Sequence, residues 1–162
     1  MPNPRSTATI AGHPIHPMLI PFPVAFFVAT LVCDFVFWRN GNATVATSAM
    51  WLLGAGILMA LLAAAVGLTD VLSDQRIFNL TDAWWHAGGN VLIVVVEAVN
   101  WYMRYSGGTS AIVPTGLVLS LIAVGGLLFT GWKGWEMVYR HRVGVADQPA
   151  SETVPQTPRR AA

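Results

Sequence analysis

The sequence predicts an all-α fold, an integral membrane bundle of four transmembrane helices with both termini cytoplasmic. The first observation is composition, because 54% of the residues are apolar and only 10% are charged, whereas soluble domains have roughly 25% charged residues. The second is the presence of four apolar stretches, each near the roughly 20 residues that a membrane-spanning helix needs. The third is the gathering of Lys and Arg on one side of these stretches.

The four apolar stretches predict the spans in order. They cover about residues 18–38, 47–68, 84–103 and 114–135. Short links at 39–42 and 106–110, rich in Gly, Asn and Ser, join the first span to the second and the third to the fourth, which predicts antiparallel neighbours. Residues 1–145 are therefore expected to form one transmembrane domain. The tail 146–162 lacks apolar periodicity and is expected to be a disordered cytoplasmic extension.

The basic residues predict the orientation. The side that holds both termini and the middle link has seven of them: Arg5, Arg76, Lys133, Arg140, Arg142, Arg159 and Arg160. The other side has only Arg39 and Arg104. Because cytoplasmic loops are enriched in Lys and Arg, we expect a multi-pass protein of the cell inner membrane with its termini in the cytoplasm. Trp and Tyr occur near the span ends and not at mid-span, as in interfacial belts that contact the lipid bilayer.

All four histidines fall on the predicted cytoplasmic side. They are the candidate cofactor ligands: His13, His16, His86 and His141. The first two lie in the segment Gly-His-Pro-Ile-His-Pro, where the prolines favour extended backbone and present both rings rigidly. Neutral imidazole is a common ligand of haem iron, copper and zinc. As metal ligands we expect His13, His16 and His86, with Asp70 and Asn90 hydrogen-bonded around them. The alternative is that the prolines only shape the entry to the first span while the histidines bond interfacial backbone.

A polar stripe runs along the third predicted helix. His86, Asn90, Glu97 and Asn100 fall within roughly an 80° arc of a helix. Because polar groups in lipid are costly, this stripe is expected to face the bundle interior. Glu97 is either protonated or paired with an arginine that reaches in, which leaves a proton or ligand path open. For Asp34 and Asn100 we favour an interhelical hydrogen-bond clamp.

Several segments together resemble a known family. They are Gly12–Pro17 followed by Pro-Phe-Pro, Gly67–Asp70, His86–Asn90, and Gly131–His141 ending in Val143–Val145. These are similar to a bacterial family of four-helix membrane proteins known as domain of unknown function 2231, over about Ile10 to Val145. Some members are joined to electron-transfer modules such as Rieske domains, so the resemblance implies a haem-binding or redox-partner role. The residue after His141 is Arg142, where the family often has glycine.

Two functional hypotheses follow. In the first, the protein binds haem b, or a copper or zinc ion, near the cytoplasmic face, with His86 and His16 or His13 as ligands, for electron transfer to a redox or membrane-complex partner. In the second, it is a small transport, assembly or structural subunit whose histidines and carboxylates bind protons or ions or only stabilise the fold. An enzyme is less favoured because no Ser or Cys is visibly paired with a base. The net charge of +1 gives no reason to expect nucleic acid as a partner.

Overall fold

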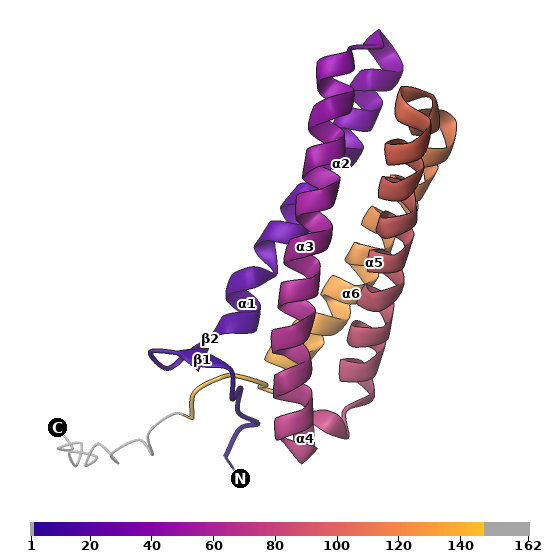
Figure 1. The fold of residues 1–162 in the computed structure, drawn as a ribbon. Helices are drawn as coiled ribbons and strands as arrows, with labels where there is room; N and C mark the ends of the chain where they lie inside the picture. The colour runs from indigo at the N-terminus through magenta and orange to yellow at the C-terminus, as the bar shows by residue number, and fades with distance from the viewer. Residues whose placement is uncertain (1, 148–162) are drawn as a thin grey trace, which may run out of the picture.

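The computed structural model describes residues 2–147, and apart from one short strand pair its regular elements are helical, which confirms the all-α prediction. Four long helices run side by side, and the short elements β1, β2, α1 and α4 lie toward the end that also holds the first described residues (Figure 1). The elements are β1 (Thr9–Ile10), β2 (His13–Pro14), α1 (Ile15–Leu19), α2 (Pro21–Asn40), α3 (Ala43–Ser73), α4 (Gln75–Phe78), α5 (Thr81–Gly107), the 3₁₀ turn η1 (Gly108–Ala111), the π-type turn η2 (Ile112–Gly116) and α6 (Leu117–Tyr139). β1 and β2 pair antiparallel.

Three continuous helical stretches are long and apolar enough to cross a membrane: Ile15–Asn40, Ala43–Ser73 and Thr81–Tyr139. The third has 59 residues and contains both α5 and α6. It reverses direction at η1 and η2 (Figure 1), where Val113 has the extended angles φ −121° and ψ 127°. α5 and α6 therefore form a hairpin, and α2 and α3 form another.

Local sequence signals explain where the first hairpin turns and bends. Gly41 ends α2 in the left-handed region at φ +65°, which glycine adopts without steric cost. The Asn42 side chain then accepts hydrogen bonds from the backbone N–H groups of Thr44 and Val45 and so caps α3. At the other end of α2, Pro21 lacks the N–H that would continue the hydrogen-bond ladder from α1. The link predicted at 39–42 is thus a tight, capped turn.

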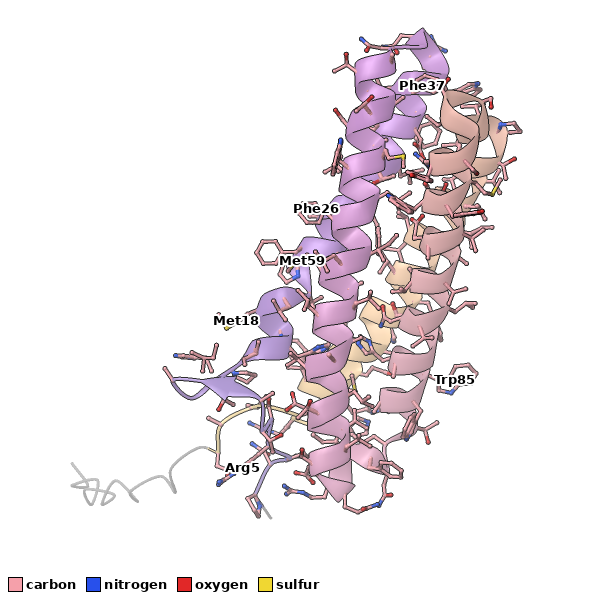
Figure 2. The ribbon with its side chains drawn as sticks, viewed as in Figure 1. Arg5, Met18, Phe26, Phe37, Met59 and Trp85 are labelled. Carbon is pink, nitrogen blue, oxygen red and sulfur yellow. The ribbon has the colours of Figure 1, made fainter. Side chains whose placement is uncertain are left out.

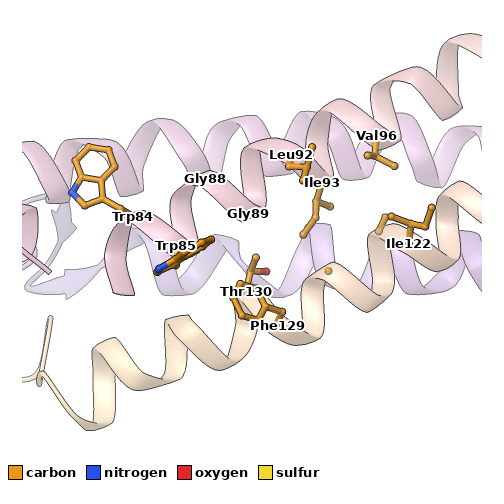
Figure 3. Close-up of a pocket in the computed structure, with 12 residues that line it drawn as sticks. Trp84, Trp85, Gly88, Gly89, Leu92, Ile93, Val96, Ile122, Phe129 and Thr130 are labelled. Atoms are coloured by element: carbon orange, nitrogen blue, oxygen red, sulfur yellow. The ribbon is translucent and has the colours of Figure 1, made fainter. Parts of the chain in front are cut away.

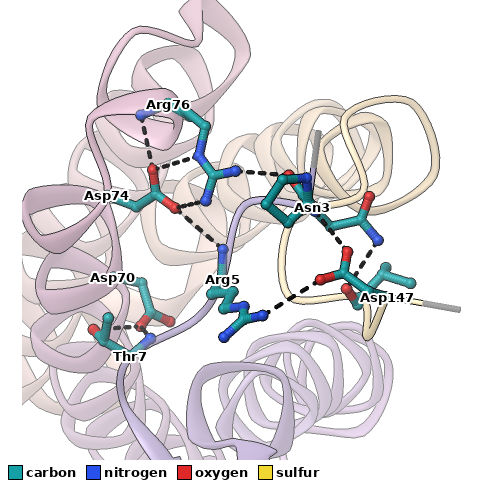
Figure 4. Close-up of polar contacts among 9 residues, drawn as sticks. Asn3, Arg5, Thr7, Asp70, Asp74, Arg76 and Asp147 are labelled. Carbon is teal, nitrogen blue, oxygen red and sulfur yellow. Dashed lines mark hydrogen bonds and ion pairs between the residues drawn. The ribbon is translucent and has the colours of Figure 1, made fainter. Parts of the chain in front are cut away.

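The N-terminal segment lies at the end of the bundle where α3 ends, and it contacts Asp70 and Asp74 there (Figure 4). Asp70, near the end of α3, accepts hydrogen bonds from the backbone N–H groups of Thr7 and Ala8 at 2.8 and 2.9 Å. The backbone N–H of Asn3 donates to Asp147 at 2.7 Å, so both described ends lie at the same end of the bundle. Asp147 is thus hydrogen-bonded, although the predicted disordered tail includes it; the tail from residue 148 onward lies outside the described residues.

The two hairpins repeat one packing pattern. The buried residues of α2 are Pro23, Phe27, Thr30 and Asp34, and the residues 70 positions later, Ile93, Glu97, Asn100 and Arg104, are buried in α5. In α3 the buried residues Ala49, Leu53, Gly56 and Ala63 correspond in the same way to Gly116, Ser120, Ala123 and Thr130, 67 positions later. Between hairpins, α3 packs on α5 and α2 packs on α6. The fold is therefore a parallel internal repeat of two helices.

The bundle is apolar outside and partly polar inside. Large apolar side chains point away from it, as Trp85 does at 59% exposure (Figure 2). Phe27, Leu53, Ile93 and Ala123 form a buried apolar cluster. Among residues 2–147, eight polar or charged residues are also buried: Thr30, Asp34, Asp70, Glu97, Asn100, Arg104, Ser120 and Thr130. This distribution is typical of a protein whose outer surface contacts lipid.

Candidate functional site

His16 is held against α3. It lies in α1, and its Nδ1 donates a hydrogen bond to the carbonyl oxygen of Ala63 at 2.8 Å. One helical turn further along α3 stands Gly67, where a Cβ atom would come within 2.8 Å of the His16 ring. Because real Cβ contacts are longer than this, glycine at position 67 is what allows the imidazole to lie so close to the helix.

His86 is held against α6 in the same way. It lies in the first turns of α5, and its Nδ1 donates to the carbonyl oxygen of Thr130 at 2.8 Å. Gly134 stands one turn further along α6, and a Cβ there would lie 3.0 Å from the His86 ring. The expected neighbour Asn90 donates to the backbone carbonyl of His86 at 2.7 Å and accepts from the Thr130 hydroxyl at 3.3 Å. Each of the two histidines thus bonds a backbone carbonyl of a long helix and packs on a glycine four residues further along the same helix.

The two histidines meet each other. Their ring centroids are 6.2 Å apart and their planes are nearly perpendicular, at 83°. A carbonyl oxygen only accepts hydrogen bonds, so Nδ1 bears the hydrogen in both rings, and Nε2 of each neutral ring has a free lone pair. Within the described part of the chain, neither Nε2 has a hydrogen-bond partner. Two pre-oriented nitrogen donors are therefore available at this end of the bundle.

The other predicted ligands lie elsewhere. His13 is exposed in strand β2. His141 follows α6, and its Nε2 lies 3.1 Å from Oδ2 of Asp82, whose Oδ1 forms an ion pair with Lys133 at 3.0 Å. Asp70 bonds the N-terminal segment and not a histidine. Of the residues expected at one site, the structure thus brings together His16 and His86, with Asn90 beside them.

Metal-binding side chains are few around this pair. No group of three or more His, Cys, Asp or Glu side chains with the proximity to hold a metal ion occurs in the part of the chain that the structure describes. A groove of about 500 Å³ lies between α5 and α6 (Figure 3) and is lined by apolar residues such as Trp84, Trp85 and Phe129. Neither His16 nor His86 lines it. The histidine pair is therefore a two-ligand arrangement outside this groove.

A second polar cluster lies nearer the other end of the bundle. Arg104 on α5 donates from both terminal nitrogens to Asp34 on α2, at 2.6 and 2.7 Å, and both side chains are almost completely buried. Its Nε donates to Asn100 Oδ1 at 2.9 Å, and the Ser120 hydroxyl on α6 donates to Asp34 at 2.8 Å. The interhelical clamp expected of Asp34 and Asn100 is confirmed, with Arg104 as its centre.

Glu97 borders this clamp. Its Oε2 accepts a hydrogen bond from Asn100 Nδ2 at 2.9 Å. Among the described residues its Oε1 is buried without a partner. The arginine that reaches into the bundle therefore forms its ion pair with Asp34 and not with Glu97. The sequence analysis did not identify Arg104 as the partner, because the periodicity of one helix does not show which residues of another helix face it; in the structure Arg104 stands one repeat offset, 70 residues, after Asp34.

The chain matches a family model. No curated protein and no solved structure matches the chain. The family model described as "Predicted membrane protein (DUF2231)" matches residues 12–147, nearly the range over which the sequence resembled that family. The apolar helices and the inside-out distribution of polar residues agree with that description. The chain therefore belongs to the family of predicted membrane proteins called DUF2231.

Proposed function

We propose that this membrane protein binds one metal ion between His16 and His86, near the cytoplasmic face of a four-helix bundle in the inner membrane. The orientation rests on the excess of Lys and Arg at the end that holds both termini, seven against two. The four-span count rests on the hairpin that α5 and α6 form within the third apolar stretch. In this orientation the histidine pair lies at the cytoplasmic end and the Asp34–Arg104 clamp toward the periplasmic end.

The observation that supports metal binding is the geometry of the pair. An ion bound in a straight line by two imidazole nitrogens at about 2 Å each places the ring centroids roughly 6 Å apart. The centroids of His16 and His86 are 6.2 Å apart before any ligand is considered. A hydrogen bond from the other ring nitrogen to a backbone carbonyl is the usual support of a metal-bound histidine, and both rings have it.

The small number of ligands favours copper in its monovalent state. Zinc is almost always held by four ligands in structural sites, and no three-residue group occurs among residues 2–147. A haem would need space for the macrocycle between the rings as well as two axial ligands, and the apolar groove between α5 and α6 does not include them. Electron transfer to a membrane partner is the role that we propose for this copper site.

A small transport, assembly or structural subunit is the second candidate. The Asp34–Arg104 clamp favours it, because this cluster joins α2, α5 and α6 by buried hydrogen bonds. In that case the hydrogen bonds of His16 and His86 to α3 and α6 would serve only to lock the helices together.

Metal titration of the purified protein separates the two. We expect the wild type to bind one Cu(I) per chain, and His16→Ala or His86→Ala to lose that site. His141→Ala is the matched control, because His141 is bonded to Asp82 and to neither histidine of the pair, and it should bind as the wild type does. If the purified protein binds no copper above background and shows no haem absorbance after growth with haem, metal binding is rejected and the structural role is favoured.

A further inference from the structure

Glu97 is a buried carboxyl group with one oxygen unused. Its side chain is completely buried, at 0% exposure, inside the bundle. Oε2 accepts from Asn100, while Oε1 has no hydrogen-bond partner among residues 2–147. Buried polar atoms in native proteins nearly always have a partner, so this oxygen requires an explanation.

The charges around Glu97 favour a neutral carboxyl group. Arg104 is the one cation of the cluster within the described residues, and Asp34 already accepts from both of its terminal nitrogens. On α6, Ser120 contributes only a neutral hydroxyl. The remaining ionisable side chains of α2, α3 and α6 lie outside the cluster's hydrogen bonds: Cys33, Arg39, Asp70, Lys133, Glu136 and Tyr139. An ionised Glu97 would add a second negative charge facing a single positive one, which is costly in a lipid-surrounded interior.

The carboxyl group is not needed to complete the clamp. Asn100 Nδ2 also lies within hydrogen-bond distance of Ser120 Oγ at 3.0 Å and of the Gly116 carbonyl at 3.3 Å. Its two hydrogens therefore have acceptors without Glu97. In the other hairpin the equivalent position, 70 residues earlier, is Phe27, which is also buried. The other hairpin thus fills the equivalent position with an apolar side chain, whereas Glu97 brings a carboxyl group whose Oε1 has no hydrogen-bond partner among residues 2–147.

We propose that Glu97 is a proton-binding site within the bundle. The O–H bond at Oε1 breaks when the site releases its proton to water, the electron pair stays on Oε1, and rebinding of a proton restores the acid. The Arg104 guanidinium stabilises the carboxylate that remains, while Asp34 holds that guanidinium in place. This proposal rests on the clamp and is independent of the histidine pair.

Infrared spectroscopy of the full chain in lipid tests the proposal. At neutral pH the wild type should show the carbonyl band of a protonated carboxyl group, and Glu97→Gln should lack it. The amide oxygen that this substitution introduces can still accept from Asn100, so the fold is expected to persist. Glu136→Gln is the matched control, because Glu136 forms an ion pair with Lys133 at 2.9 Å outside the cluster; it should keep the band.

Isotopes make the test independent of the variant. The chain has three glutamates, Glu97, Glu136 and Glu152, so side-chain ¹³C labelling of glutamate in the wild type should shift the band. In D₂O the same band should shift reversibly, because the proton exchanges. If no band responds to the glutamate label, Glu97 is ionised and the proposal fails. If the band responds to the label but not to D₂O after full equilibration, the proton is locked and the proposal fails as well.

Discussion

Asp34 and Arg104 are opposite charges that the bundle buries almost completely, with side chains 0% and 2% exposed. Two charges inside a membrane protein are tolerated when each is fully hydrogen-bonded. Here the guanidinium is bonded to Asp34, Asn100 and Ser120, and Ser120 also donates to Asp34. Removing one partner leaves the other charge buried and uncompensated, which costs more than the pair itself contributes.

Asp34→Asn should therefore destabilise the protein strongly. We expect a loss of about 3–5 kcal/mol in the free energy of unfolding, as for other broken buried ion pairs, measured by denaturation in detergent. Asp147→Asn makes the same change in the exposed pair with Arg5, at 3.5 Å, and should cost far less, because exposed ion pairs contribute little to stability. Similar losses in both variants would contradict the role of burial.

The sequence predicts which polar residues face the bundle interior better than it predicts which residues they contact there. The arc of His86, Asn90, Glu97 and Asn100 predicts an inward polar stripe, and all four lie on the interior side of α5 as buried or half-buried residues. The partner of Asp34 could not be predicted from periodicity, because periodicity describes one helix at a time. The pairing depends on how α2 and α5 are placed across the bundle.

At the scale of helices, glycines determine how closely the histidines approach. His16 lies on Gly67 of α3, and His86 lies on Gly134 of α6. A methyl group at either glycine would push the ring away from the carbonyl that holds its Nδ1. The sequence identifies these glycines as small residues for close helix packing, but it does not show that an imidazole, and not a helix backbone, occupies the space.

Gly67→Ala should displace His16 from α3. The new Cβ would stand 2.8 Å from the ring, so we expect lost copper binding and a stability loss of about 1–3 kcal/mol, typical of overpacking. Gly131→Ala is the control in a helix, because a Cβ at Gly131 meets nothing within 4 Å; it should keep copper and be stabilised by up to about 1 kcal/mol. Metal content and denaturation midpoints of the two variants decide between these outcomes. Copper retained by Gly67→Ala would show that the close contact is unimportant.

The carboxyl group of Asp74, at the start of the short helix α4, should make the free energy of unfolding depend on pH in the acid range. Asp74 caps α4, and its hydrogen bond with the Arg76 side chain, 2.6 Å at the shortest, holds the pKa of Asp74 well below its usual range. Because the folded pKa is the lower one, the contribution is complete above the ordinary aspartate pKa of about 3.9 and is lost as the pH falls below it.

Asp74→Asn isolates this effect, since Asn caps helices about as well as Asp. The wild type should be the more stable protein at neutral pH, and the difference between the two should shrink below about pH 4. Melting temperatures in detergent across this range measure it. A difference that grew on acidification would have the wrong sign for a lowered folded pKa.

For the whole molecule, composition and hydropathy predict the fold class, because a lipid-facing surface affects most residues. The internal repeat is harder to find in the sequence, since only the burial pattern recurs. Equivalent positions hold different chemistry, such as Phe27 and Glu97 or Asp34 and Arg104. His16 and His86 are an exception, because both equivalent positions hold histidine; these two side chains also meet each other. The sequence placed all four histidines on one side, but it could not show that only these two come together.

Topology can be tested with reporter fusions. Fusions in the links at 39–42 and 106–110 should report the periplasm, and fusions after Val145 should report the cytoplasm, because basic residues favour the cytoplasmic side. The described ends of the chain lie together at one end of the bundle, so both termini must give the same answer. A periplasmic C-terminus would invert the assignment and place the histidine pair at the periplasmic face.

The coordination of copper tests the central claim most directly. The account predicts that X-ray absorption of the Cu(I)-loaded protein shows two imidazole nitrogens at about 2 Å, and that His16→Ala and His86→Ala both abolish this signal while His13→Ala does not. A copper shell dominated by sulfur, or one unchanged in His16→Ala and His86→Ala, would contradict it.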